Sequence, residues 1–241
     1  MQQITTALVL GANRYKVERQ TGGYLYLLEP GDHENPDALG LGIRKVKMPY
    51  EMYDQLRDKR VPAVFDVLTE AERAGQEADN EIAVSVRGDG KLTAETLNEL
   101  FGISASAKAP GKVPDQPLQG AAYALVIAAS RFEAEDGRRY SNIVISQKTS
   151  GRNPNQLGFE IIRIPIAWDL FAAFQAKGLP GEYKLLTSLR SGSGFKARLK
   201  VDGVEGENYL DQTRLHQLFG VQPQQPQAPR PANPEAPAKP A

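Results

Sequence analysis

An internal repeat constrains this sequence more than any other feature, because four segments of the first half recur in the same order in the second. The spacing between matched segments stays between 115 and 118 residues. The matched pairs are 7–18 with 124–135, 41–49 with 157–165, 61–68 with 179–186, and 92–103 with 210–221. This period is too long for one unit of a solenoid, so each copy is expected to fold as a whole domain.

Each copy is predicted to be rich in strands. In the second copy, alternating or continuous apolar residues and the turn residues between them predict five strands, a short helix and a closing amphipathic helix. The strands are expected at Tyr123–Glu135, Tyr140–Gln147, Phe159–Ile166, Glu182–Leu189 and Phe195–Val201, and the helices at Trp168–Ala176 and 211–219. This order predicts a mainly β chain of two tandem five-stranded OB-like barrels. Each barrel would carry a short helix between strands three and four and a helix at its C-terminal end. A five-stranded SH3-like barrel or a small sandwich is the competing fold.

The chain divides into four segments by composition. Residues 1–104 and 121–221 form the two predicted domains. Residues 105–120 have the Pro, Gly and Lys content of a flexible linker, and residues 222–241 form a Pro-, Ala- and Gln-rich tail that is expected to be disordered.

Composition argues against several classes of function. The 241 residues include no cysteine and only two histidines, His33 and His216, far apart in sequence. Disulfides and thiolate metal sites are therefore absent, and a histidine-based catalytic or zinc site is not expected. We expect no enzyme activity, no metal and no cofactor. The N-terminal segment lacks a signal-peptide pattern and no run is long enough to span a membrane, so a cytoplasmic protein without membrane contact is expected.

The two domains differ in charge. Residues 1–104 hold 12 Lys and Arg against 17 Asp and Glu, whereas residues 121–221 hold 13 against 10. The second domain is thus better suited to phosphates, and the acidic first domain is expected to serve a protein interface or to bind weakly.

Binding to single strands requires cations that follow the phosphates and flat side chains that stack on bases. In the second domain, Lys196, Arg198 and Lys200 alternate with apolar residues on the last strand, which predicts a ladder of cations on one face. A solvated outer face is the alternative for this ladder, and a core position is the alternative for Phe195. The full set of candidates in this domain is Arg138, Arg139, Tyr140, Arg163, Phe195, Lys196, Arg198 and Lys200.

The first domain retains fewer candidates. Arg14, Tyr24 and Lys47 stand at places that match the second copy, and Lys47 is aligned with Arg163. The last strand of this copy contains IAVSV in place of a basic run. Trp168 is the only tryptophan and is expected in the core.

The second copy resembles the single-stranded DNA-binding proteins of filamentous phages, the gene-five type. The likeness lies in Gly137-Arg138-Arg139-Tyr140-Ser141, in Ile161–Ile164, in Leu179–Tyr183, and in the Gly-rich hairpin that leads to Phe195–Val201. It covers about residues 124–205 and, more weakly, 7–90. The resemblance implies non-specific, cooperative coating of single strands. It does not identify whose strands are coated; an origin in a phage or mobile element is a further expectation. The family's members are single domains that form homodimers, whereas this chain holds two domains, each with an added C-terminal helix.

The leading hypothesis is a single-stranded DNA-binding protein that coats or protects replication intermediates, with RNA as an alternative ligand and self-association as a further expectation. A protein-binding adaptor or anti-defence factor that uses the same barrels and the Pro-rich tail is the second hypothesis. A structural assembly protein, with contacts through the C-terminal helices, is the third.

Overall fold

The computed structural model describes residues 2–32, 34–73, 79–103, 121–149, 153–191 and 197–221. Within these ranges the chain is mainly β, with eleven strands and four short helices. The strands of the first half are β1 (Gln2–Val17), β2 (Gln20–Glu29), β3 (Ala38–Gly40), β4 (Gly42–Met48), β5 (Ala63–Arg73) and β6 (Asp79–Arg87); its helices are α1 (Met52–Lys59) and α2 (Ala94–Phe101). The second half contains β7 (Ala121–Glu133), β8 (Arg139–Lys148), β9 (Gln156–Pro165), β10 (Gly181–Ser191) and β11 (Ala197–Glu205), with α3 (Leu170–Lys177) and α4 (Gln212–Phe219).

Five strands of the first half close into a barrel. β1 pairs with β2, β2 with β4, β4 in parallel with β6, β6 with β5, and β5 returns to the N-terminal half of β1. Helix α1 lies between β4 and β5. This is the strand order of an OB barrel, so the predicted mainly β, OB-like fold is confirmed for this barrel.

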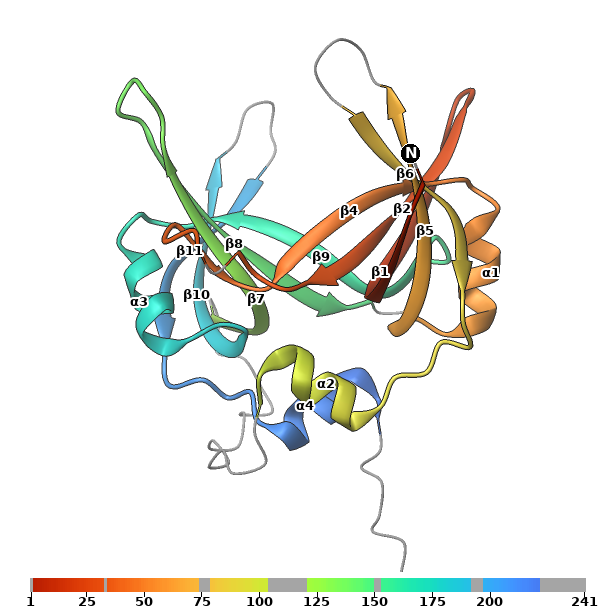
Figure 1. Ribbon diagram of the computed structural model, residues 1–241. Coiled ribbons are helices and arrows are strands. Elements are labelled where there is room, and N and C mark those ends of the chain that lie inside the picture. Colours follow the sequence, from red (N-terminus) through yellow and green to blue (C-terminus); the bar gives the residue numbers. More distant parts are fainter. Residues whose placement is uncertain are drawn as a thin grey trace, which may run out of the picture.

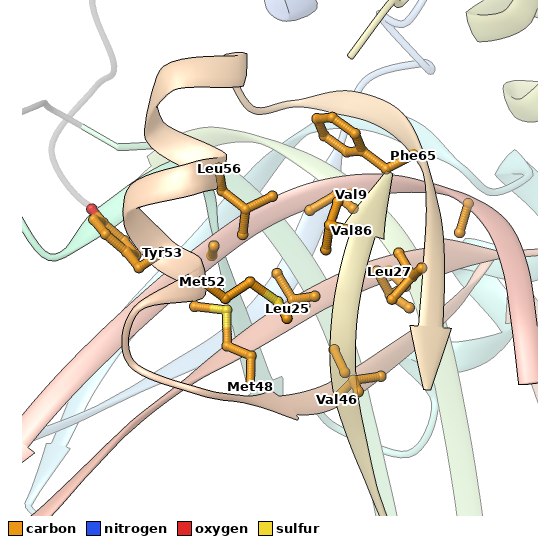
Figure 2. Packing of buried hydrophobic residues seen from close by; sticks show 14 of the residues in the cluster. Val9, Leu25, Leu27, Val46, Met48, Met52, Tyr53, Leu56, Phe65 and Val86 are labelled. Carbon is orange, nitrogen blue, oxygen red and sulfur yellow. The ribbon is translucent and has the colours of Figure 1, made fainter. Parts of the chain in front are cut away.

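The core of this barrel follows from the alternation of side chains along its strands. Leu25 and Leu27 of β2 and Val46 and Met48 of β4 point inward, and all four are nearly inaccessible to solvent. Helix α1 adds Met52, Tyr53 and Leu56 to the same cluster (Figure 2). The residues between these inward positions must therefore face outward, which places the polar residues of β2 and β4 on the outer surface.

The strands of the second half pair in the same sequence. β7 pairs with β8, β8 with β9, β10 with β7 and β11 with β10, and a parallel bridge joins Ile166 to Val201. Helix α3 lies between β9 and β10, and α4 follows β11. The bulge at Leu186/Thr187 stands 118 residues after the bulge at Leu68/Thr69.

The two halves join into one continuous sheet. Residues 11–13 of β1 pair with residues 156–158 of β9, and residues 38–40 of β3 pair with residues 128–130 of β7. At Gly11 an added Cβ would lie 2.1 Å from the Phe159 carbonyl oxygen, so only glycine allows this approach. Helices α2 and α4 lie side by side beneath the sheet, and the β1–β2 and β7–β8 hairpins project from the opposite side (Figure 1).

The strand register corrects one match made from sequence. Lys45 pairs with Tyr26, and Tyr26 in turn pairs with the first residue after the bulge in β1. Arg163 pairs with Val144, and Val144 in turn pairs with the first residue after the bulge in β7. The counterpart of Arg163 is therefore Lys45, 118 residues earlier, and the alignment with Lys47 was wrong by two residues. A shift of two keeps every side chain on its face of a strand, which is why the pattern alone did not expose the error.

Several expectations fall on segments outside the described residues, namely the linker 105–120 and the tail 222–241. Among the helices that are described, none has the length and apolar character to cross a membrane.

Candidate nucleic-acid interface

The outer surface of β1, β2 and β4 carries a group of rings and cations. We call this group the tyrosine–lysine face; it consists of Tyr15, Tyr24, Tyr26, Lys45 and Lys47. Leu25 and Leu27 of β2 and Val46 and Met48 of β4 point into the barrel core, so alternation places the tyrosines of β2 and the lysines of β4 outside. On β1, Ala12 is in the core, and Tyr15, three residues later, therefore faces outward. This is the face on which OB barrels bind oligonucleotides.

Contacts within the face hold its rings in place. The rings of Tyr15 and Tyr24 lie 5.7 Å apart at a tilt of 30°, and Lys45 Nζ lies 3.7 Å from the centroid of the Tyr24 ring. Asn13 Nδ2 donates a hydrogen bond of 3.1 Å to the Tyr26 hydroxyl. Burial raises the pKa of Tyr26, so its hydroxyl is neutral at physiological pH.

A glycine makes room for the outermost ring. Gly22 is the cross-strand partner of Tyr15, and a Cβ added to Gly22 would lie 2.9 Å from the Tyr15 hydroxyl. The ring can therefore lie across the neighbouring strand. A ring fixed in this way loses little further freedom when a base stacks on it.

The cations of this face are not neutralised by acids. Within the described part of the chain, neither Lys45 nor Lys47 forms an ion pair. Lys45 is exposed and Lys47 is half-buried. Two lysines beside two adjacent tyrosine rings can bind phosphates while the rings stack on bases.

In the second half, the matching surface lies on β7, β8 and β9. Phe132 and Tyr140 are cross-strand partners on the β7–β8 hairpin, with exposed fractions of 63% and 45%. Arg163 of β9 is also exposed, and no ion pair involves it among the described residues. This half therefore presents an exposed aromatic pair and the exposed cation of Arg163 on its outer surface.

The two arginines before Tyr140 are placed differently from Tyr140, and each of them is paired with an acid. Arg139 is the neighbour of Tyr140 on β8 and faces the other side of the hairpin, where its Cζ lies 5.3 Å from the Trp168 ring. Its Nε is 2.9 Å from Glu133 Oε2, and Arg138 Nε is 2.6 Å from Asp136 Oδ2. Both side chains are more than half exposed, so a phosphate could compete with these surface ion pairs.

Trp168 was expected in the core, and this was wrong. The ring is half-buried and lies between Arg139 and Arg131, whose Cζ is 5.4 Å from it. It lies two residues before the first residue of α3 and is not part of the buried cluster of the second half. It is therefore a natural fluorescent probe of the second half.

The predicted ladder on the last strand is only partly described. Phe195 and Lys196 lie outside the described residues, and for Arg198 only the backbone, in β11, is described. Lys200 is 25% exposed and its Nζ lies 3.6 Å from Asp202 Oδ1. Val201 is fully buried as expected, but Leu199 is 42% exposed. At Leu199 β11 pairs only with β10, so the hairpin has passed the barrel core and its apolar face is uncovered.

Arg14 holds the two halves together. Its Nε donates to Asn155 Oδ1 at 3.0 Å, its Nη1 lies 3.1 Å from Asp54 Oδ1, and its side chain is only 16% exposed. Its Cζ lies 4.5 Å from the centroid of the Tyr53 ring. Arg131, 117 residues later, is placed similarly, with its Cζ 4.5 Å from the Phe171 ring and its Nε 2.6 Å from Asp37 Oδ1. These partners leave Arg14 little capacity to bind phosphate.

Sequence reasoning missed Lys45, Tyr15 and Phe132. Each follows from strand alternation, because Val46, Ala12 and Ala129 are the buried residues that fix the phase on β4, β1 and β7. No group of three or more potential metal ligands occurs in the described ranges.

No protein family model matches the chain, and no curated protein matches its sequence. Among solved structures, it is similar to a deletion mutant of the single-stranded DNA binding protein from Thermus aquaticus. The identity is 10%, the match covers 85% of this chain and 92% of that one, and the TM-score is 0.25. It is also similar to a replication protein A heterotrimer bound to single-stranded DNA, at 10% identity and a TM-score of 0.27, over 91% of this chain and 51% of that one.

Proposed function

We propose that this chain is a non-enzymatic protein that binds single-stranded DNA without sequence preference. The observation that carries the proposal is the tyrosine–lysine face, in which adjacent rings and acid-free lysines lie on the outer surface of a closed OB barrel. Rings stack on any base and lysines bind any phosphate, so such a surface gives affinity without reading sequence.

We further propose that the chain is a tandem duplication of one OB barrel, and that both halves contribute to binding. The matched strand order, the reciprocal pairings β1–β9 and β3–β7, and the matched bulges support this proposal. Asn98 and His216 are 118 residues apart in sequence, and Asn98 Oδ1 lies 3.1 Å from His216 Nε2. Phe101 and Phe219 are also 118 residues apart, and their ring centroids lie 5.6 Å from each other. Contacts between equivalent residues are the mark of a two-fold axis, here within one chain.

In this proposal the second half binds through Phe132, Tyr140 and Arg163, with Arg138 and Arg139 available once their acids are displaced. The biological role would be to coat or protect replication intermediates. For that role, and for an origin in a phage or mobile element, the support is the resemblance to the filamentous-phage family.

The test is a titration of fluorescein-labelled oligo-dT, followed by anisotropy and by Trp168 fluorescence, with duplex DNA and RNA of equal length as controls. We expect tight binding to oligo-dT and weak binding to the duplex, because paired bases cannot stack on exposed rings. Equal affinity for the duplex would reduce the interaction to general charge attraction. Absence of binding to every nucleic acid would favour the protein-adaptor hypothesis.

A further inference from the structure

A groove of about 630 Å³ lies between the two halves, and no residue of the tyrosine–lysine face lines it. It forms where the end of α1, the segment before α2, the end of β8 and the end of α4 meet. We call it the basic groove; its lining includes Arg57, Arg60, Val61, Leu92, Lys148, Leu157 and Val221. Its volume lies within the roughly 300–1,000 Å³ typical of ligand pockets.

Three cations line this groove, and two of them have no acid partner in the described part of the chain. Arg60 and Lys148 are exposed and form no ion pair there. Arg57 Nη1 lies 3.2 Å from Asp54 Oδ1 and is partly neutralised. The floor between the cations is aliphatic, from Val61, Leu157 and Val221.

The backbone at Arg60 is unfavourable for arginine. Its φ is 62°, whereas the residue 118 positions later is Gly178, with a φ of 85°. Glycine adopts such angles without strain, whereas an arginine there is strained. Strained residues of this kind cluster at functional and ligand-binding sites.

The two halves differ at one lining position of the groove. In the second half Asn208 Oδ1 accepts hydrogen bonds from Glu182 N at 3.1 Å and from Leu210 N at 2.9 Å. The residue 118 positions earlier is Gly90, which has no side chain to fill the groove. The first half therefore has Arg60 and Gly90 where the second half has Gly178 and Asn208.

We propose that the basic groove binds an acidic peptide segment with aliphatic side chains, supplied by a partner protein. Carboxylates would pair with Arg60 and Lys148, and aliphatic side chains would cover the floor. Nucleic acid fits less well, because the only ring in the lining, Phe219, is 8% exposed and packs against Phe101 and Phe159. The chain's own tail is a poor complement, since residues 222–241 hold two cations and one acid.

The test uses the full-length, ¹⁵N-labelled chain and a pool of ten-residue peptides in which Asp or Glu alternates with Leu, Ile or Val. A second pool carries Lys or Arg in place of the acids. We expect the acidic pool alone to shift the amide signals of Gly90, Leu92, Thr93 and Val221 in a saturable manner. If these shifts are absent at millimolar concentrations of the acidic peptides, or if the basic pool causes equal shifts, the proposal is overturned.

Two variants assign the effect to the cations. Arg60→Gly installs the residue of the other half, so folding should be kept, and Lys148→Gln removes the second charge. Each should weaken the acidic pool about tenfold, as expected for one lost charge-assisted hydrogen bond. Lys177→Gln, at the matching end of α3, should change nothing. Unchanged affinity in both groove variants, or the same amide shifts with oligo-dT, would contradict the proposed peptide site.

Discussion

In the first half, Tyr15 lies over Gly22 and Lys45 covers the ring of Tyr24, whereas in the second half Phe132 faces Tyr140 and both rings are exposed. The strand frames beneath these surfaces are paired in the same way. Tyr15 has a glycine as its cross-strand partner, whereas Phe132 has a second ring, Tyr140. The two outer surfaces therefore differ in chemistry although the strands beneath them pair in the same way.

The contacts between the halves show the opposite behaviour. Arg14 and Arg131 each bind an acid and the rings of the neighbouring helix, and each reaches the other half through Asn155 or Asp37. These side chains are occupied by contacts that join the two halves, whereas the rings and lysines of the outer faces are left available to a ligand.

The largest effect should come from the junction. Phe219 packs against Phe101 at 5.6 Å and Phe159 at 4.9 Å in the core shared by both halves. Phe219→Ala should lower the free energy of unfolding by about 3–5 kcal/mol, measured by urea denaturation. Phe132→Ala, at an exposed ring, should change it by no more than about 0.5 kcal/mol. Equal losses would mean that the junction is no more important to stability than the wings.

The second prediction concerns the pH dependence of stability, to which the cores of the two halves should contribute differently. Tyr183 is fully buried and burial raises its pKa to about 12, whereas its counterpart Phe65 has no ionisable group. Because the folded pKa lies above the unfolded value of 10.0, stability is intact below pH 10 and is lost as the pH rises toward 12. Tyr183→Phe should remove on the order of 2 kcal/mol of this alkaline loss. Stability curves of both proteins from pH 8 to 12 would show it; curves that stay parallel would contradict the assignment.

A smaller effect concerns the rings on the outer faces. Tyr24→Ala should weaken oligo-dT binding by about 1–3 kcal/mol, the value of one stacked base, and Tyr24→Phe should bind nearly as wild type. Phe132→Ala should cause a similar loss if the second half binds as well. A loss for only one of the two alanine variants would show that a single half carries the stacking.

The strands, their order and the places of the short helices could be predicted from the sequence, because buried residues such as Leu25, Leu27 and Val46 recur at strand spacing and turn residues separate the runs. The closing helices were predictable too, since Leu97 and Phe101, or Leu215 and Phe219, fall on one helical face. These features depend on local pattern alone.

The site was harder to predict. A register error of two residues preserves the alternation of side chains along a strand, so the sequence pattern could not show that Lys45, and not Lys47, matches Arg163. The role of Arg14 depends on Asn155, which is 141 residues away in sequence and is brought near only by the pairing of β1 with β9. Composition favoured the second half for binding, but net charge does not reveal that Arg138 and Arg139 are paired with acids while Lys45 and Lys47 are not.

The salt dependence of oligo-dT binding tests the central claim most directly, because it counts the phosphates that the tyrosine–lysine face neutralises. Each phosphate bound on a single strand contributes about −0.7 to the slope of log K against log salt. The double change Lys45→Ala and Lys47→Ala should therefore flatten the slope by about 1.4, with Lys177→Gln as a control that leaves it unchanged. A slope and an affinity that both match the wild type would show that this face does not bind single strands.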